Sequence, residues 1–214
     1  LKAYDEVVGY HHGIRQPLRD VLQKLNPTTI AINYSEGDVA ADGLSLGMYR
    51  NLLTILDGTP YADRLISAEQ IVAAVRGRKS PEEIERVQTA DFTTEQLFDE
   101  VEQFAKPGMT QRQIANFVRG RIDEMGLDYA WPKPFNPIVT CGPDSASGHA
   151  APGDVVLQKG HTLHMDLGIK QNEYCSDIQR MWYVLDDGET EAPSEVQRAF
   201  DVVLGAIQAG EKAL

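Results

Sequence analysis

The chain of 214 residues lacks the features that mark membrane-spanning and nucleic-acid-binding proteins. It contains no run of eighteen apolar residues, which excludes a helix that crosses a bilayer. Lys and Arg number 20 against 32 Asp and Glu, so the net charge is −12. Phosphate contacts need clustered cations, which this composition does not supply. We therefore expect neither a membrane nor a nucleic acid as a partner.

Cysteine is also scarce, because Cys141 and Cys175 are the only two in the chain. No CxxC spacing or Cys/His zinc pattern accompanies them, which excludes a redox motif and a structural zinc site. So few cysteines in a chain of this length favour a reducing compartment, and we predict a cytoplasmic protein. Cys175 is interpreted as a small packing residue rather than a nucleophile, since no His base lies beside it in the sequence.

Hydrophobic residues make up 42% of the chain, as expected for a globular protein, and two regions can be distinguished. In the first, leucine and valine recur at helical spacing over residues 16–25, and Asn26-Pro27 ends that segment. A strand over 28–33, a helix over 45–56, a strand at 65–66 and a helix over 68–75 follow. This alternation predicts an α/β unit.

The second region begins with a helix-start signal at Ser80-Pro81, with Glu83 at the capping-box position. We predict a helix over 81–104 and another from Thr110 to Gly126. Further predicted elements are strands over 137–141, 163–169 and 174–184 and a final helix from Ser194. Helices followed by an antiparallel sheet predict an α+β arrangement.

The last two predicted strands carry Asp166 and Asp177, eleven residues apart. If Gln171-Asn172 forms a two-residue hairpin loop, Lys170 faces Glu173 and Asp166 lies directly opposite Asp177. Cross-strand partners have Cβ atoms ~5 Å apart, where like charges repel.

Two carboxylates in that arrangement require a shared proton or a cation. A bridging pair suits two metal ions ~3.5–4 Å apart. The alternative is a solvated aspartate on each strand of a surface hairpin, and the spacing alone does not decide between the two.

A wider pattern of motifs surrounds the two aspartates. In order, it comprises Gly142-Pro143-Asp144-Ser145-Ala146, His149 with Pro152, Gly160, Asp166-Leu-Gly168 and Tyr174-Cys-Ser-Asp177-Ile-Gln-Arg180. Upstream, residues 75–84 and 106–110 carry further motifs of the same kind. The ordered set resembles metallopeptidase family M24, which includes aminopeptidase P, prolidase and methionine aminopeptidase. The resemblance covers roughly residues 60–185.

The resemblance implies a pita-bread fold of α+β class, as in creatinase and the aminopeptidases. Residues 79–214 would form the first half of that catalytic domain, and residues 1–78 the carboxy-terminal part of a creatinase-like α/β amino-terminal domain. The family site uses two Asp and then a His and two Glu later in the chain. Only the two Asp are matched here, so we expect this chain to be part of a longer protein.

The function implied by the resemblance is hydrolysis of Xaa-Pro peptide bonds in proline-containing peptides by a metal-activated water. Asp166 and Asp177 would bind two divalent cations (Mn, Co or Zn), and His149 would stabilise the tetrahedral intermediate. The general base would be one of the later Glu residues. Family members often dimerise, so we expect a homodimer.

Two other functions stay open: a metal-free creatinase-type C–N hydrolase, which retention of both Asp disfavours, and a non-catalytic homologue that acts as a binding module. His164 departs from the apolar residue common at its position in the family, and we interpret it as a packing residue or a hydrogen-bond partner behind the site. Trp131 and Phe135 would line a substrate pocket or pack, and packing is favoured. Arg180 is expected to form a structural ion pair.

Overall fold

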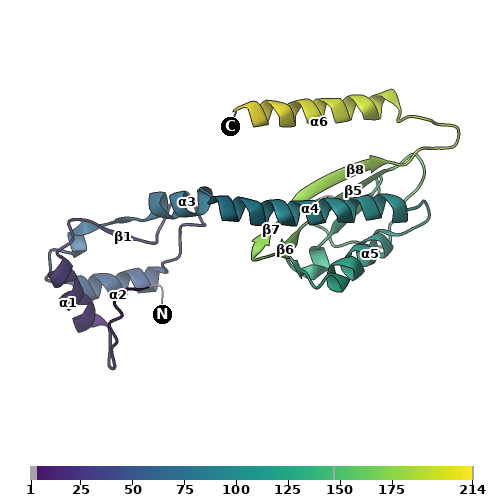
Figure 1. The fold of residues 1–214 in the computed structure, drawn as a ribbon. Helices are drawn as coiled ribbons and strands as arrows, with labels where there is room; N and C mark the ends of the chain where they lie inside the picture. Colours follow the sequence, from purple (N-terminus) through teal and green to yellow (C-terminus); the bar gives the residue numbers. More distant parts are fainter. Residues whose placement is uncertain (1–3, 147, 214) are drawn as a thin grey trace. The chain divides into compact units, whose positions relative to one another are not determined.

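The computed structural model describes residues 4–146 and 148–213 of the chain. Its contacts divide the chain into two units, Leu1–Lys79 and Ser80–Leu214, and each is described here by itself (Figure 1).

The first unit has the alternating helices and strands that its sequence predicts. Its elements are α1 (Arg15–Leu25), β1 (Ile30–Ile32), α2 (Leu46–Leu56), the short 3-10 helix η1 (Ala62–Arg64), β2 (Leu65–Ser67) and α3 (Glu69–Gly77). Strands β1 and β2 pair in parallel. Leu22, Ile55, Leu56 and Tyr61 form a small buried core. The Nε of Arg19 donates to the carbonyl oxygen of Ile55 at 2.6 Å, which ties α1 to the end of α2.

The described residues of the second unit form three α-helices, one 3-10 helix and two three-stranded sheets. Its elements are α4 (Pro81–Phe104), α5 (Gln111–Glu124), β3 (Asp128–Tyr129), the 3-10 helix η2 (Lys133–Phe135), β4 (Ile138–Cys141), β5 (Thr162–Leu167), β6 (Ile169–Gln171), β7 (Tyr174–Cys175), β8 (Ile178–Tyr183) and α6 (Ser194–Ala213). The sheet orders are β3-β6-β7 and β4-β5-β8, and all these pairs are antiparallel.

Helices α4 and α5 begin where their capping residues predict. The Ser80 hydroxyl accepts from the backbone N–H of Glu83 at 3.3 Å, and the Glu83 carboxylate accepts from the Ser80 N–H at 2.6 Å. Thr110 and Gln113 form the same reciprocal capping box at the start of α5. These contacts satisfy N–H groups that a helix start otherwise leaves without partners.

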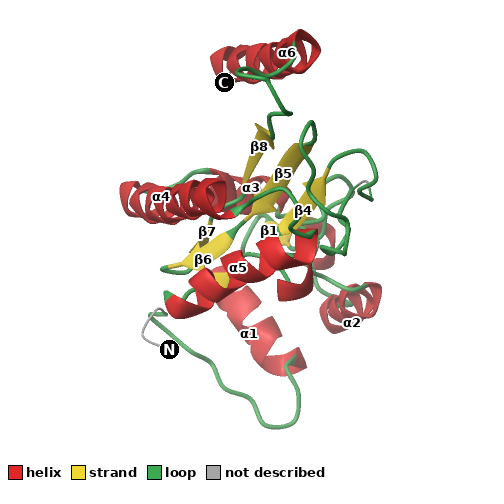
Figure 2. Ribbon diagram, turned by 90° about the vertical axis from the view of Figure 1, so that its right-hand side faces the viewer, coloured by secondary structure: helices red, strands yellow, loops and turns green. Residues whose placement is uncertain are grey.

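Helices α4 and α5 lie beside the strands (Figures 1 and 2), and buried residues of both helices and of the strands form the core of the second unit. Burial alternates along β5, so that Leu163, Met165 and Leu167 face the core. Thr162, His164 and Asp166 therefore lie on the opposite face of the strand, following the period of two in a pleated sheet. By contrast, none of the described residues of α6 is buried.

The predicted strands 163–169 and 174–184 are each interrupted. The first breaks at Gly168, and the second breaks after Cys175, where Ser176 turns inward. The Ser176 hydroxyl accepts from the backbone N–H of Ile169 at 3.0 Å and contacts the Thr94 hydroxyl at 2.7 Å. Burial of Ser176 leaves Cys175 exposed, so the prediction that Cys175 packs inside was wrong.

The predicted hairpin register was also wrong. The loop is Asn172-Glu173, both with positive φ as in a type I′ turn, rather than Gln171-Asn172. The register therefore shifts by two residues, and Asp166 pairs with Gln179 rather than with Asp177.

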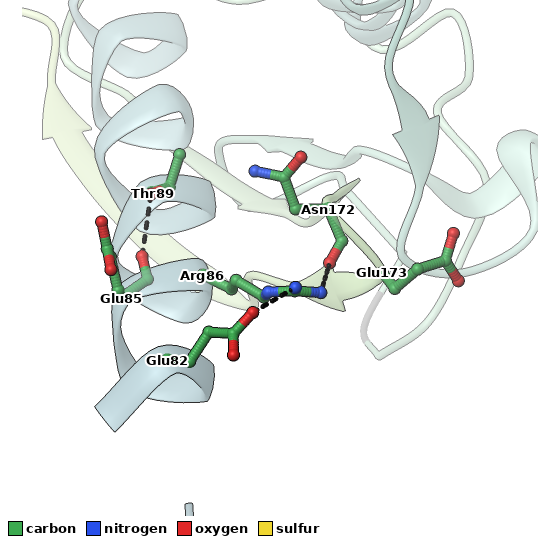
Figure 3. A pocket seen from close by; sticks show the side chains of 6 residues that line it. All are labelled: Glu82, Glu85, Arg86, Thr89, Asn172 and Glu173. Atoms are coloured by element: carbon green, nitrogen blue, oxygen red, sulfur yellow. Dashed lines mark hydrogen bonds and ion pairs between the residues drawn. The ribbon is translucent and has the colours of Figure 1, made fainter. Parts of the chain in front are cut away.

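Helix α4 braces this turn, as the side chains in Figure 3 show. One guanidinium nitrogen of Arg86 donates to the carbonyl oxygen of Asn172 at 3.4 Å, and the other pairs with Glu82 at 2.6 Å. The Tyr174 hydroxyl donates to Glu83 at 2.6 Å, and Thr93 donates to Gln171 at 2.9 Å. Contacts from α4 therefore support the observed register.

Across residues 4–146 and 148–213, no helix combines the length and apolarity needed to cross a membrane.

Candidate functional site

The predicted site residues meet in one pocket of about 510 Å³ in the second unit. It is lined by Trp131, Pro132, Phe135, Ile138, His149, Asp166 and Asp177. Asp166 comes from β5, Asp177 precedes β8, and His149 belongs to the loop between β4 and β5. The two aspartates are not directly opposite, but a register shift of two residues leaves every side chain of β5 on the same face of the sheet.

The two oxygens of Asp166 have different surroundings. Its Oδ2 accepts from the Nε2 of Gln179 at 3.3 Å. Its Oδ1 is buried and has no hydrogen-bond donor among the described residues. A buried carboxylate oxygen without a donor is costly unless a positive charge or a proton is supplied.

The position of Asp166 also shifts its pKa. Burial, and then the charge of the neighbouring Asp177, raise the pKa of Asp166 above its ordinary value. His164 and His149 act in the opposite direction and lower it. Asp177 therefore lies close enough to destabilise the ionised form of Asp166, and a cation between the two would relieve that repulsion.

These two carboxylates fit a hard divalent cation, because such cations prefer oxygen ligands. No group of three or more His, Cys, Asp or Glu side chains suited to a metal ion occurs within the described part of the chain. Among the described residues, the candidate metal ligands are therefore Asp166 and Asp177.

The loop that carries His149 is held at both ends by helix α5. Buried Gln111 donates from Nε2 to the Ser145 hydroxyl at 2.9 Å and accepts on Oε1 from the Gly153 N–H at 2.9 Å. Arg112 forms a two-point ion pair with Asp154, at 3.0 and 3.2 Å. The loop therefore leaves and rejoins the scaffold at defined points, with exposed His149 between them.

Aromatic residues form one wall of the pocket. Trp131 and Phe135 both line it, and the indole N–H of Trp131 donates to the carbonyl oxygen of Phe135 at 2.7 Å. The Trp131 ring also lies against Gly168, where an added Cβ would be 2.3 Å from Cζ3. Packing alone, which the sequence favoured, was an incomplete description, because both side chains line the pocket and Trp131 also covers Gly168.

Two polar residues near Asp166, Gln179 and Thr140, were not recognised from the sequence as neighbours of the site. Gln179 bonds to Asp166 and also, through Oε1, to the Nε2 of His164 at 3.0 Å. The Nδ1 of His164 contacts the Thr140 hydroxyl at 3.5 Å. The correct strand register would have identified Gln179, because Gln179 pairs with Asp166. His164 contacts Gln179 rather than Asp166, so it is a hydrogen-bond partner behind the site, as expected.

Arg180 forms the structural ion pair that was predicted. Its guanidinium pairs with Glu95 of α4 and lies 5.5 Å from the centre of the Phe98 ring. Arg180 therefore fixes β8 to α4 on the side of the sheet away from Asp166.

Known proteins resemble this chain in sequence and in fold. The sequence pattern of metallopeptidase family M24 matches residues 85–214. An uncharacterized peptidase of Staphylococcus saprophyticus is 29% identical over 175 residues, which make up 82% of this chain and 47% of that protein. An uncharacterized peptidase of Staphylococcus haemolyticus is 29% identical over 138 residues, or 64% of this chain and 37% of that protein. The chain spans about half the length, or less, of the curated relatives it matches.

Two solved structures extend the comparison. The X-Pro aminopeptidase from Thermotoga maritima has a TM-score of 0.65 and 25% identity, covering 96% of this chain and 52% of that one. A putative aminopeptidase P from Bacillus anthracis has a TM-score of 0.70 and 17% identity, covering 95% of this chain and 46% of that one. The chain thus has the fold of about half of a pita-bread protein. Since the family pattern covers more than half of its residues, the chain belongs to metallopeptidase family M24.

Proposed function

We propose that the protein is a metal-dependent peptidase that cleaves Xaa-Pro peptide bonds. The observation that carries this proposal is the pair Asp166 and Asp177 in an apolar-walled pocket, with the Oδ1 of Asp166 buried and without a donor among the described residues. Membership of family M24 supports metallopeptidase chemistry, and the likeness to an X-Pro aminopeptidase supports the substrate class. Because the chain spans about half of these relatives, the proposal concerns the activity of the whole protein.

Asp166 and Asp177 would hold two divalent cations, of which Mn, Co and Zn are the candidates. Such cations, when bound, lower the pKa of a water molecule and polarise a carbonyl group. Gln179 would keep one oxygen of Asp166 occupied while Oδ1 stays directed to the cation. The two aspartates, whose charges repel in the metal-free site, would then both be ionised.

His149 would act on the oxygen of the scissile carbonyl. Its side chain lines the same pocket as the aspartates, and its ring N–H would donate to the negative charge that develops on that oxygen. The contacts of Gln111 with Ser145 and Gly153 support this role, because a braced loop orders its side chain at lower entropic cost.

The apolar wall would supply substrate selectivity. Trp131, Pro132 and Phe135 form a surface against which a pyrrolidine ring packs, and apolar pockets with few polar groups are typical of small-ligand sites.

We also propose two domains, whose boundary lies one residue before the division of the structure between Lys79 and Ser80. Residues 1–78 would be the carboxy-terminal part of a creatinase-like domain, and residues 79–214 the first half of the pita-bread domain. The homodimer and the cytoplasmic location stay predictions.

A pair of matched variants tests the proposed function. Asp177→Asn removes a pocket carboxylate, and Asp99→Asn removes an exposed carboxylate of α4. Each variant of the whole protein would be purified, titrated with Mn²⁺ by calorimetry and assayed on Ala-Pro-Ala and Ala-Ala-Ala. We expect wild type and Asp99→Asn to bind Mn²⁺ and to cleave the proline peptide selectively, and Asp177→Asn to lose both properties.

Each contrary outcome identifies the part of the proposal that fails. Unchanged hydrolysis by Asp177→Asn would refute the metal mechanism and favour a metal-free hydrolase. Peptide binding by the wild-type protein with no hydrolysis of either peptide would favour a binding module. Equal cleavage of both peptides would refute the proline specificity alone.

A further inference from the structure

A series of hydrogen-bonded polar side chains leads to Asp166 across one face of the β4-β5-β8 sheet. Thr140 contacts His164 at 3.5 Å, His164 contacts Gln179 at 3.0 Å, and Gln179 donates to Asp166 at 3.3 Å. The strand register explains this order, since Thr140 pairs with His164 and Gln179 pairs with Asp166. The four residues therefore come from three adjacent strands.

The chemistry of the acceptors sets the direction of these bonds. An ionised carboxylate only accepts, so the amide nitrogen of Gln179 faces Asp166 and its amide oxygen faces His164. That oxygen also only accepts, so the Nε2 of His164 carries the proton. The Nδ1 of His164 contacts the Thr140 hydroxyl at the other end of the series. The donor groups of His164 and Gln179 therefore both point toward Asp166.

The two oxygens of Asp166 therefore have different roles. Gln179 fixes Oδ2, while Oδ1 stays buried without a donor among the described residues. We propose that Gln179, held in turn by His164, is a positioning residue that presents the Oδ1 of Asp166 to a divalent cation. This inference rests on the proposed metal site and extends it to two residues outside the ligand set.

The exposure of Gln179 separates positioning from general stability. Gln179 is exposed on β8, and exposed substitutions that make no buried contact have little effect on folding. Its loss should therefore weaken cation binding without unfolding the metal-free protein. Partners that orient a ligating side chain commonly change metal affinity by about 10–100-fold.

The test uses Gln179→Met, which keeps the length of the side chain and removes both hydrogen bonds. Met181→Leu is the matched control, because Met181 is 60% exposed and lies two residues further along β8. Calorimetric titration of the whole protein with Mn²⁺ alone would measure affinity, and its urea denaturation in chelator would measure stability. We expect Gln179→Met to weaken Mn²⁺ binding by about 10–100-fold, with a wild-type urea midpoint.

A second variant tests the link through His164. His164→Leu should weaken Mn²⁺ binding by less than Gln179→Met does, because the amide of Gln179 still reaches Asp166. If His164 acts only through Gln179, the double variant should bind Mn²⁺ within about twofold of Gln179→Met alone. Two independent, multiplying losses would overturn the link.

The outcomes distinguish this inference from the proposed function. Wild-type Mn²⁺ affinity in Gln179→Met, with binding lost in Asp177→Asn, would overturn the positioning role and leave the metal site standing. Failure of the wild-type protein to bind Mn²⁺ would refute the proposed site and this inference together. If Gln179→Met lowered the urea midpoint of the metal-free protein, His164→Leu with wild-type Mn²⁺ affinity would still overturn the inference.

Discussion

Gly168 occupies a crowded backbone position beside the pocket-lining ring of Trp131, and replacing it with alanine should destabilise the second unit. An added Cβ would lie 2.3 Å from Cζ3 of Trp131, 2.5 Å from the carbonyl oxygen of Ser176 and 2.8 Å from the Cβ of Ala130. All three distances are far below van der Waals contact. The Ser176 oxygen belongs to the backbone, so no side-chain rotation relieves that clash.

The backbone around Gly168 cannot shift freely either. Its carbonyl oxygen accepts from the Nδ2 of buried Asn136 at 2.6 Å and from the backbone N–H of Ala130 at 3.2 Å. Movement away from Ser176 would weaken these bonds. Overpacking typically costs 1–3 kcal/mol, so we expect Gly168→Ala to lower the free energy of unfolding by about 3 kcal/mol.

Gly120 provides a control with the same chemical change and the opposite sign. It lies within helix α5, and an added Cβ there would meet no atom within 4 Å. Alanine has the higher helix propensity, so Gly120→Ala should raise the free energy of unfolding by about 0.5–1 kcal/mol.

Urea denaturation followed by tryptophan fluorescence suits this comparison, because both tryptophans, Trp131 and Trp182, belong to the second unit. The signal therefore reports the unit that contains both substitutions. A free energy of unfolding for Gly168→Ala within about 0.5 kcal/mol of wild type would refute the argument, since it would show that the chain between β5 and β6 moves aside easily.

Three further predictions concern the second unit. Cys175 should react quickly with a thiol reagent at pH 8 and Cys141 only after unfolding, because Cys175 is exposed whereas burial raises the pKa of the Cys141 thiol to about 11. Ser176→Ala should lower the free energy of unfolding by about 1–3 kcal/mol, measured in urea, because it leaves the buried N–H of Ile169 without its hydroxyl acceptor. Burial, and then the neighbouring carboxylate, raise the pKa of Asp166, so folded metal-free protein retains a proton that the unfolded chain has lost. Its stability in chelator should therefore fall as pH rises from the unfolded pKa through the folded pKa, and Asp166→Asn should remove this fall.

Each of these predictions has a contrary result. Two thiols that react at equal rates in the native protein would contradict the assigned exposure. A loss below about 0.5 kcal/mol in Ser176→Ala would show that another group satisfies the Ile169 N–H. Parallel curves of stability against pH for wild type and Asp166→Asn would contradict the raised pKa.

Local sequence determined where helices begin. The capping boxes at Ser80 and Thr110 connect residues three positions apart, so the pattern is complete within one turn of chain. The same holds for the face of β5, because alternation with period two assigns Asp166 to the side away from the core. The family motifs likewise identified Asp166, Asp177 and His149, which the structure brings into one pocket.

Tertiary structure decided the register of the hairpin and the interruption of its strands. Several polar residues between Ile169 and Tyr174 allowed more than one turn position, and contacts from α4 to Asn172 support the observed one. Burial of Ser176 depends on Thr94, which lies 82 residues earlier in the chain. These contacts join distant segments, and no local pattern records them.

The sequence alone therefore singled out three candidate site residues that line one pocket, and the family to which the chain belongs. Only the tertiary structure decided that Gln179 faces Asp166, because that pairing depends on a shift of two residues in strand register. The shift preserves the face of every side chain but changes every cross-strand partner. Alternation along a strand therefore predicts which side a residue occupies, whereas the turn and the packing that holds it decide what that residue contacts.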